Sequence, residues 1–260
     1  MPMPFTVVDV FTDKPFGGNP AAVMLLDAWP DDALLQSIAL EHNLSETAFL
    51  VPSDGEADYE LRWFTPTVEI AMCGHATLAS GHVVLGERAA VRFATRKAGV
   101  LTVGRDGEGY TLDLPVTRVA PAPDAGLLAA LRCEGEVFAS VSGAQQTSII
   151  LLPDAAAVRA CAPDMAALAA CEVMAIVTAP GDVADIVSRV FVPAWGVDED
   201  PVTGSAHAAL APFWAERLGR DRFTAFQASA RGGRLTCTLN GDRAVLGGQC
   251  VTVMRGELLL

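Results

Sequence analysis

The amino-acid sequence predicts an α+β protein made of two similar halves, each a mostly antiparallel β-barrel around a central buried helix. Short β-rich segments bounded by turn residues run along the whole chain, and their order with the helices occurs twice. Each copy also contains one helix-length segment without Lys, Arg, Asp or Glu, at 70–85 and at 202–215. A helix that is apolar on every side is buried on every side, so we expect each segment to lie inside its own set of strands.

The first half begins with two strand signals that the turn-forming stretch DKPFGGNP separates. The helix that follows has Leu34, Leu35 and Ile38 at helical spacing and acidic residues at its start. Around a Gly-rich turn after the central helix, apolar and polar residues alternate as in a hairpin. The elements predicted in order are strands 5–11 and 21–26, a helix 31–43, strands 47–51 and 59–64, the central helix, and a hairpin over 99–115.

The second half repeats this order. Its helical stretch 154–170 has a predicted break at Pro163, and an Asn-Gly turn marks a hairpin after the second central helix. The predicted elements are strands 137–141 and 147–153, the broken helix, strands 173–180 and 185–193, a helix from about 205, a hairpin over 235–248, and a strand 249–260. An aromatic-x-Pro sequence ends the strand before each central helix, as Phe64-Thr65-Pro66 and Phe191-Val192-Pro193. This repetition indicates a duplication.

The Pro-rich stretch LPVTRVAPAPD, around residue 120, marks the join between the halves. We therefore predict an N-terminal barrel domain over 1–118 and a C-terminal barrel domain over 119–250. The C-terminal strand, 251–260, is available to complete the first barrel.

The composition excludes several classes of function. The net charge is −13 and the isoelectric point is near 4.6, which argues against nucleic acid and anionic membranes as partners. The six cysteines form no CxxC pair, so we expect free thiols in a reducing compartment. The N-terminus lacks the features of a signal peptide, and no apolar run has transmembrane length. We expect a cytoplasmic protein.

Each central helix begins in a loop of small residues, MCGHA at 72–76 and VTGSA at 202–206. The N-terminus of a helix offers unpaired backbone N–H groups and a partial positive charge. If both helix starts face one cleft, they can hold a carboxylate or stabilise an enolate-like anion. The alternative is that the glycines only permit tight turns while Ser205 or Thr203 caps its helix.

Glu46, in LSETAFL, is the most informative single residue. If 47–51 is a strand, Glu46 lies on an otherwise apolar face that it shares with Ala48 and Leu50. A partly dehydrated carboxylate suits the role of a group that takes and returns a proton. The alternative is an exposed carboxylate at a strand end, or one that caps a turn with Ser45.

Other chemistries find less support in the sequence. A metal site would have to use Cys73, His75, His82 and His207, whose spacing forms no established ligand pattern. The nucleotide-binding patterns Gly-x-Gly-x-x-Gly and Gly-Lys-Ser/Thr are absent, so we expect no cofactor. A serine hydrolase is disfavoured because Ser205 lacks the Gly-x-Ser-x-Gly elbow.

Four segments, GGNP, SETAF, FTPTVEIAMCGHATLA and EDPVTGSAHAALA, together resemble the phenazine-biosynthesis PhzF-like family. That family shares the diaminopimelate epimerase fold of two similar halves, each a barrel around a helix. The segments span residues 17 to 211. The resemblance implies isomerisation by proton transfer without a cofactor, a small carboxylate-bearing substrate, and a homodimer.

The resemblance also implies roles for individual residues. The family's catalytic glutamate and histidine correspond to Glu46 and His75, and the aspartate and serine of its DPxTGSA motif correspond to Asp200 and Ser205. Substrate binding is expected from backbone groups of the helix starts and from the cleft lining, at Asn19, Cys73, Gly74, Thr203 and Gly204. One stretch departs from the family pattern, FQASARGGRL, which leaves Arg231 and Arg234 without an assigned role.

Related epimerases and racemases use a cysteine at each of the two helix starts. This sequence has Cys73 at the first start but Val202 or Thr203 where the second would lie. We therefore interpret Cys73 as a small buried residue, although a helix N-terminus can also lower the pKa of a thiol.

The sequence thus predicts an isomerase in which Glu46 is the acid and base. Two alternatives remain open. One is an epimerase or racemase that depends on Cys73, and the other is a non-catalytic ligand-binding or interaction module on the same fold.

Overall fold

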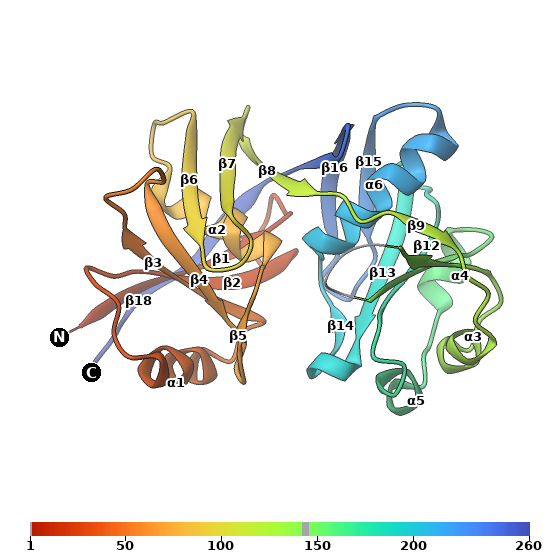
Figure 1. The fold of residues 1–260 in the computed structure, drawn as a ribbon, viewed down its shortest axis with the longest axis horizontal. Coiled ribbons are helices and arrows are strands. Elements are labelled where there is room, and N and C mark those ends of the chain that lie inside the picture. The colour runs from red at the N-terminus through yellow and green to blue at the C-terminus, as the bar shows by residue number, and fades with distance from the viewer. Residues whose placement is uncertain (1, 142–145) are drawn as a thin grey trace. The chain divides into compact units, whose positions relative to one another are not determined.

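A computed structural model describes residues 2–141 and 146–260, and the chain divides into two compact units (Figure 1). Unit 1 consists of Met1–Leu114 together with Gly247–Leu260, and unit 2 consists of Pro115–Leu246. Both units are mostly strands around one buried helix, which confirms the predicted fold class.

Unit 1 is a sheet that encloses the helix α2, Gly74–Val84, which packs against β1, β2, β3, β7 and β18. Its strands are β1 (Met3–Val10), β2 (Asn19–Leu25), β3 (Glu46–Pro52), β4 (Tyr59–Phe64), β5 (Glu69–Ile70), β6 (Ala90–Thr95), β7 (Val100–Asp106), β8 (Gly109–Pro115) and β18 (Cys250–Leu258). The helix α1, Asp32–His42, connects β2 to β3. In Figure 1 the blue C-terminal strand β18 runs beside the red N-terminal strand β1, with which it pairs antiparallel.

Unit 2 has its own central helix, α6, Gly204–Leu218, which packs against β16. Its strands are β9 (Val119–Pro121), β10 (Glu136–Ser140), β11 (Thr147–Leu151), β12 (Met174–Pro180), β13 (Ile186–Val192), β14 (Val197–Asp200), β15 (Arg222–Gln227), β16 (Gly233–Asn240) and β17 (Arg243–Gly248). Short helices cover it at α3 (Ala125–Leu131), α4 (Ala155–Ala160) and α5 (Met165–Ala169), and a 3₁₀ turn, η1 (Pro193–Trp195), precedes β14.

Strand pairing follows the same sequence of steps in both units, which supports the duplication. In unit 1 the pairs β1–β2, β3–β4, β4–β5 and β6–β7 are antiparallel, whereas β2–β3 and β4–β6 are parallel. In unit 2 the pairs β10–β11, β12–β13, β13–β14 and β15–β16 are antiparallel, whereas β11–β12 and β13–β15 are parallel. Each parallel pair is bridged by helical chain, and the central helix bridges the second one in both units.

The central helices form where the sequence is apolar on all sides. Every residue of α2 from Gly74 to Gly81 is buried. Helix α6 tolerates a proline in its interior, Pro212, although proline has no N–H to give to the carbonyl of Ala208. The backbone N–H of Thr117 lies 3.4 Å from that carbonyl oxygen and donates to it instead.

Several elements differ from the prediction or were missed by it. The break at Pro163 is confirmed, because α4 ends at Ala160 and α5 begins at Met165. Helix α3 was not predicted, and β14 lies in a segment that the sequence indicated to be a loop. Among the described residues, no helix has the length and apolar composition needed to span a bilayer.

Candidate functional site

Three neighbouring elements of unit 1 bring together most of the site residues predicted in the first half. Asn19 begins β2, Glu46 begins β3, and His75 lies in the first turn of α2. Strands β2 and β3 run parallel, with Glu46 opposite Ala21, so both strands begin on the same side of the unit. Residues that are 27 or more positions apart in the sequence thus contribute to one cluster.

The imidazole of His75 is the centre of this cluster. Its Nε2 atom lies 3.0 Å from Oε2 of Glu46. Its Nδ1 atom lies 3.2 Å from Nδ2 of Asn19, and the hydroxyl of Ser45 donates to Oδ1 of Asn19 at 3.3 Å. With its oxygen engaged by Ser45, Asn19 presents its NH₂ group to Nδ1, so the neutral imidazole accepts there and carries its proton on Nε2, toward Glu46.

The contact between Glu46 and His75 is close but poorly aligned. Neither Oε2 of Glu46 nor Nε2 of His75 has a well-aligned hydrogen-bond partner among the described residues, and both atoms are buried. The Glu46 side chain is 16% exposed and that of His75 is 5% exposed. Catalytic hydrogen bonds are often long or misaligned in the absence of substrate, and this geometry fits a pair that exchanges protons.

The ionisation of His75 is distinctive. Burial by itself lowers the pKa of His75, but the sulfur of Cys73 and the carboxylate of Glu46, both beside the ring, outweigh burial and raise the pKa well above its ordinary value. For the other three histidines, His42, His82 and His207, burial lowers the pKa. Of the four histidines, His75 is therefore the one whose surroundings raise its pKa.

Cys73 is the residue immediately before α2, and its sulfur lies 3.5 Å from Nδ1 of His75. Burial, followed by the nearby charge of Glu46, raises the pKa of this thiol. Cys73 is thus a protonated thiol at neutral pH. This direction fits a small buried residue and not a reactive thiolate.

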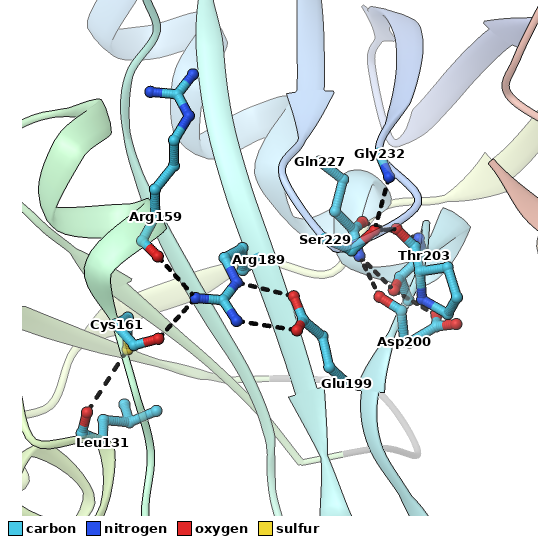
Figure 2. Close-up of polar contacts among 11 residues, drawn as sticks. Leu131, Arg159, Cys161, Arg189, Glu199, Asp200, Thr203, Gln227, Ser229 and Gly232 are labelled. Carbon is cyan, nitrogen blue, oxygen red and sulfur yellow. Dashed lines mark hydrogen bonds and ion pairs between the residues drawn. The ribbon is translucent and has the colours of Figure 1, made fainter. Parts of the chain in front are cut away.

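In unit 2, Asp200 and Thr203 are joined by a third residue, Gln227 (Figure 2). The hydroxyl of Thr203 donates to Oδ2 of Asp200 in a short hydrogen bond. Gln227, at the end of β15, accepts from the backbone N–H of Thr203 at 2.9 Å and donates to the backbone oxygen of Asp200 at 2.6 Å. The loop before α6 is therefore held from both ends by one buried side chain.

Ser205 and His207 lie in the first turn of α6 with different surroundings. The hydroxyl of Ser205 is partly buried, and within the described part of the chain it donates only to the sulfur of Met174, at 3.8 Å. His207 donates from Nδ1 to the backbone oxygen of Thr203 at 2.8 Å, and burial lowers its pKa to about 4. His207 is thus a neutral core histidine, whereas Ser205 retains a hydroxyl with only a weak partner.

The two central helices differ from the others at their N-termini. Helices α1, α3, α4 and α5 are each capped by an aspartate that accepts a backbone N–H three residues ahead: Asp31, Asp124, Asp154 and Asp164. Helices α2 and α6 have no side-chain cap, because neither Cys73 nor Thr203 accepts such a bond. The alternative in which Thr203 caps α6 is therefore wrong. Uncapped N–H groups are free to bind an anion.

Glu46, Cys73 and His75 form a group whose potential metal-binding atoms lie within 4.8 Å of one another. The sulfur approaches Nδ1 of the ring, whereas the carboxylate approaches Nε2. A metal ion bound to one ring nitrogen would lie beside either the sulfur or the carboxylate, but not beside both. The arrangement therefore suits proton transfer better than coordination of one ion by all three residues. His82, which we had considered as a ligand, contacts Tyr110 and Thr252 instead.

Gln227 was missed in the sequence, although it lies in the stretch FQASARGGRL that departs from the family pattern. Within that stretch Ser229 donates to the backbone oxygen of Pro201 at 2.7 Å, so it also contacts the loop before α6. Arg234 donates to the backbone oxygen of Val183 at 3.0 Å, outside this network. A glutamine at a strand end carries no signal of its own, so only the fold reveals its role.

Comparisons of the sequence and of the structure with known proteins indicate the same family. The family model described as phenazine biosynthesis-like protein (PhzC-PhzF) matches residues 8–256. A Pseudomonas aeruginosa protein named as an uncharacterized isomerase is 48% identical over 267 residues, which cover 100% of both chains. A crystal structure of a PhzF-family protein from Enterococcus faecalis has a TM-score of 0.93 and 41% identity over 100% of both chains. A hydroxyproline epimerase from Agrobacterium vitis shares the fold alone, with a TM-score of 0.62 and 14% identity over 99% of this chain and 92% of the other.

Proposed function

Because the chain belongs to the phenazine biosynthesis-like family, in which relatives are named isomerases, we propose that it is a cofactor-independent isomerase that moves a proton on a small carboxylate-bearing substrate. The observation that carries the proposal is the contact between Glu46 and His75, 3.0 Å apart and both largely buried. Such a pair can take a proton from carbon and return it without a metal or an organic cofactor.

In the proposed reaction, Glu46 removes a proton from an acidic carbon of the substrate and returns it at another position of the conjugated system. His75 is the partner of Glu46 and donates to the developing anion, because its raised pKa keeps a proton on the imidazole. Asn19 orients the ring through Nδ1. A single base that serves both positions removes the need for the second thiol that related epimerases use.

The substrate carboxylate is proposed to bind the backbone N–H groups of a helix start, at Gly74 and His75 or at Gly204 and Ser205. The absence of a side-chain cap on α2 and α6 supports this role, since a capping carboxylate would compete with the substrate. Asp200 and Ser205 are proposed as further catalytic residues: Asp200 orders Thr203, and Ser205 acts through its weakly engaged hydroxyl.

Two alternatives make different demands on the protein. An epimerase that depends on Cys73 needs a thiolate, whereas burial raises the pKa of this thiol. A non-catalytic binding module needs no proton donor, whereas the raised pKa of His75, 3.0 Å from the carboxylate of Glu46, suits one. Both observations favour the isomerase.

The test is incorporation of solvent deuterium into carbon, followed by NMR and mass spectrometry across a panel of small unsaturated or cyclic carboxylates. We expect exchange with the wild-type protein and a loss of about 10²- to 10⁴-fold in Glu46→Gln, the usual contribution of a general base. Cys73→Ala is the matched control, since it alters the same cluster without removing the base, and it should retain exchange. Exchange that survives in Glu46→Gln would remove Glu46 from the role, and exchange that disappears in Cys73→Ala would favour the thiol mechanism.

A further inference from the structure

Arg189 and Glu199 form a two-pronged ion pair beside the loop that leads into α6 (Figure 2). The Nε and Nη2 atoms of Arg189 donate to the two carboxylate oxygens of Glu199 at 2.8 and 2.9 Å. Its Nη1 atom donates to the backbone oxygens of Arg159 and Cys161 at 3.1 and 2.6 Å. The guanidinium is therefore held on every side, and its carboxylate partner is adjacent in sequence to Asp200.

Unit 1 contains the same pair at the corresponding place. The Nε and Nη2 atoms of Arg62 donate to the two carboxylate oxygens of Glu69, both at 2.8 Å. Its Nη1 atom lies 2.9 Å from a carboxylate oxygen of Asp32. The side chain of Arg62 is only 3% exposed and that of Glu69 is 28% exposed, so this ion pair is partly buried, as is that of Arg189 and Glu199.

The two pairs agree in register as well as in chemistry. Glu69 is the cross-strand partner of Phe64, and Glu199 is the cross-strand partner of Phe191. In both units the arginine stands two residues before that phenylalanine and lies over its ring, with the guanidinium carbon 5.0 Å from the centroid of Phe64 and 4.9 Å from that of Phe191.

The distance from the glutamate to the helix is also the same. Glu69 lies four positions before Cys73, and Glu199 lies four positions before Thr203; Cys73 and Thr203 directly precede α2 and α6. Elsewhere the two segments differ, since the connection from the phenylalanine to the glutamate is longer in unit 2. The arginine, the phenylalanine, the glutamate and the spacing to the helix are the parts that both units share.

Burying an arginine and a glutamate is costly, and replacing such a pair by apolar residues is often neutral or stabilising. The same pair occurs at the same register in both units, although their other core residues differ. A contribution to stability alone is therefore a poor explanation for the repetition. A two-pronged pair does fix the relative orientation of its two side chains, because the planar guanidinium can donate both hydrogen bonds only when the carboxylate lies in its plane.

We propose that Arg62–Glu69 and Arg189–Glu199 are positioning pairs, each of which fixes the approach of the chain to its own central helix so that the uncapped N–H groups of that helix remain aligned for an anion. Glu69 acts on Gly74 and His75, and Glu199 acts on Asp200, Gly204 and Ser205. The inference deepens the proposed function and rests on it for the identity of the anion as a substrate carboxylate.

Sulfate titration followed by amide NMR of the whole chain tests this inference without a known substrate. Glu199→Gln keeps the shape of the side chain but removes its charge, and we expect sulfate affinity reported by the Gly204 and Ser205 amides to fall about tenfold, the loss of one hydrogen bond to a charged group. The Gly74 and His75 amides should be unaffected. Glu69→Gln should give the reverse pattern, and Arg189→Lys, which keeps the charge but not the two-pronged geometry, should resemble Glu199→Gln.

Asp182→Asn provides a matched control. Arg159 makes a two-pronged pair with Asp182 in the same unit, at 2.6 and 2.9 Å, but this pair is exposed. The Asp182→Asn variant should leave sulfate binding at both helices unchanged. If Glu199→Gln does not fold, Arg189→Lys provides the same comparison, and thermal unfolding reports the stability of each variant.

Equal losses at both helices with a lowered melting temperature would show a general structural role and overturn the proposal. Unchanged affinity at the cognate helix, or no sulfate binding in the wild type, would also overturn it. The outcome is separate from that of deuterium exchange: helix-specific changes in a protein that exchanges no deuterium would reject the isomerase and retain the positioning role.

Discussion

His75 differs from the other three histidines because a carboxylate faces its ring in a buried setting. His75 and His207 both lie near the start of a central helix, and both are buried. Burial lowers the pKa of His207 to about 4, whereas the neighbours of His75 reverse that direction. The same residue type thus has its pKa shifted in opposite directions, because Cys73 and Glu46 lie beside the ring of His75.

NMR titration of the imidazole carbons can measure this difference. We expect His75 to titrate well above pH 6.5 in the wild type. In Glu46→Gln its pKa should fall, because burial remains while the opposing negative charge is lost. His207 should titrate at about 4 in both proteins and serves as the internal reference. A His75 pKa that is the same in both proteins would show that Glu46 does not set its ionisation.

The sign of this shift also fixes how stability depends on pH. Because the folded-state pKa of His75 is raised, its contribution to the free energy of unfolding is complete below the unfolded value of about 6.5. The contribution is lost as the pH rises through the higher folded-state pKa. Urea unfolding at a series of pH values should show this loss in the wild type and a smaller one in Glu46→Gln. A wild type that gains stability over the same range relative to the variant would contradict the assignment.

At the scale of single residues, the sequence identified the participants but not their contacts. Glu46 was recognisable from its place on an apolar strand, whereas the role predicted for His75 came from the resemblance of FTPTVEIAMCGHATLA to the family motif. The contact of His75 with Asn19, 56 positions away, depends on how β2 lies against α2, which no local pattern describes. Gln227 was missed for the same reason, since its neighbours in space are 24 and 27 positions away.

At the scale of elements, the close fit of α2 inside its sheet depends on a glycine. A Cβ atom on Gly81 would lie 2.4 Å from Cγ1 and 2.7 Å from Cβ of Val103, on β7. Alanine is the better helix former by about 1 kcal/mol, but the branched side chain of Val103 cannot move away within a packed core. The steric clash with Val103 therefore outweighs the higher helix propensity of alanine.

We accordingly expect Gly81→Ala to lower the free energy of unfolding by about 1–3 kcal/mol, the usual cost of overpacking. Gly126→Ala in α3 is the matched control, because its nearest neighbour would be Oδ1 of Asp124 at 3.4 Å and the change should be neutral or stabilising. Adding Val103→Ala to Gly81→Ala should recover part of the loss if the two side chains clash. Urea unfolding measures all four proteins, and a stable Gly81→Ala would show that α2 has room to shift.

The central helices and the hairpins were predictable because each follows from a local rule, an uncharged run or a turn between alternating residues. Helix α3 was not, because its seven residues come directly after the Pro-rich join, which resembles a linker. Strand β14 is short and owes its pairing with β13 to contacts such as the one between Arg189 and Glu199. An Arg-x-Phe-x-Pro sequence in both halves was a usable signal for these pairs, at 62–66 and 189–193.

At the scale of the whole molecule, unit 1 is assembled from both ends of the chain. Strand β18 pairs with β1 along its length, from Met3 opposite Leu258 to Val10 opposite Cys250. The hydroxyl of Thr252, on β18, also lies 2.9 Å from Nε2 of His82 on α2. The last strand therefore supports both the sheet and the central helix that carries His75. Unit 2, Pro115–Leu246, lies between the two segments in sequence.

Removing residues 250–260 should therefore destabilise unit 1 selectively. Without β18, β1 loses one of its two neighbouring strands and α2 loses part of its cover, so the amides of β1, β2 and α2 should exchange faster with deuterium. The amides of β11, β12 and β13 in unit 2 should retain their protection. Removing only Leu259 and Leu260, which are exposed and follow β18, is the control and should change neither unit. Equal loss of protection in both units would mean that the chain unfolds as one cooperative body, and an unchanged pattern would mean that β1 is stable without its C-terminal partner.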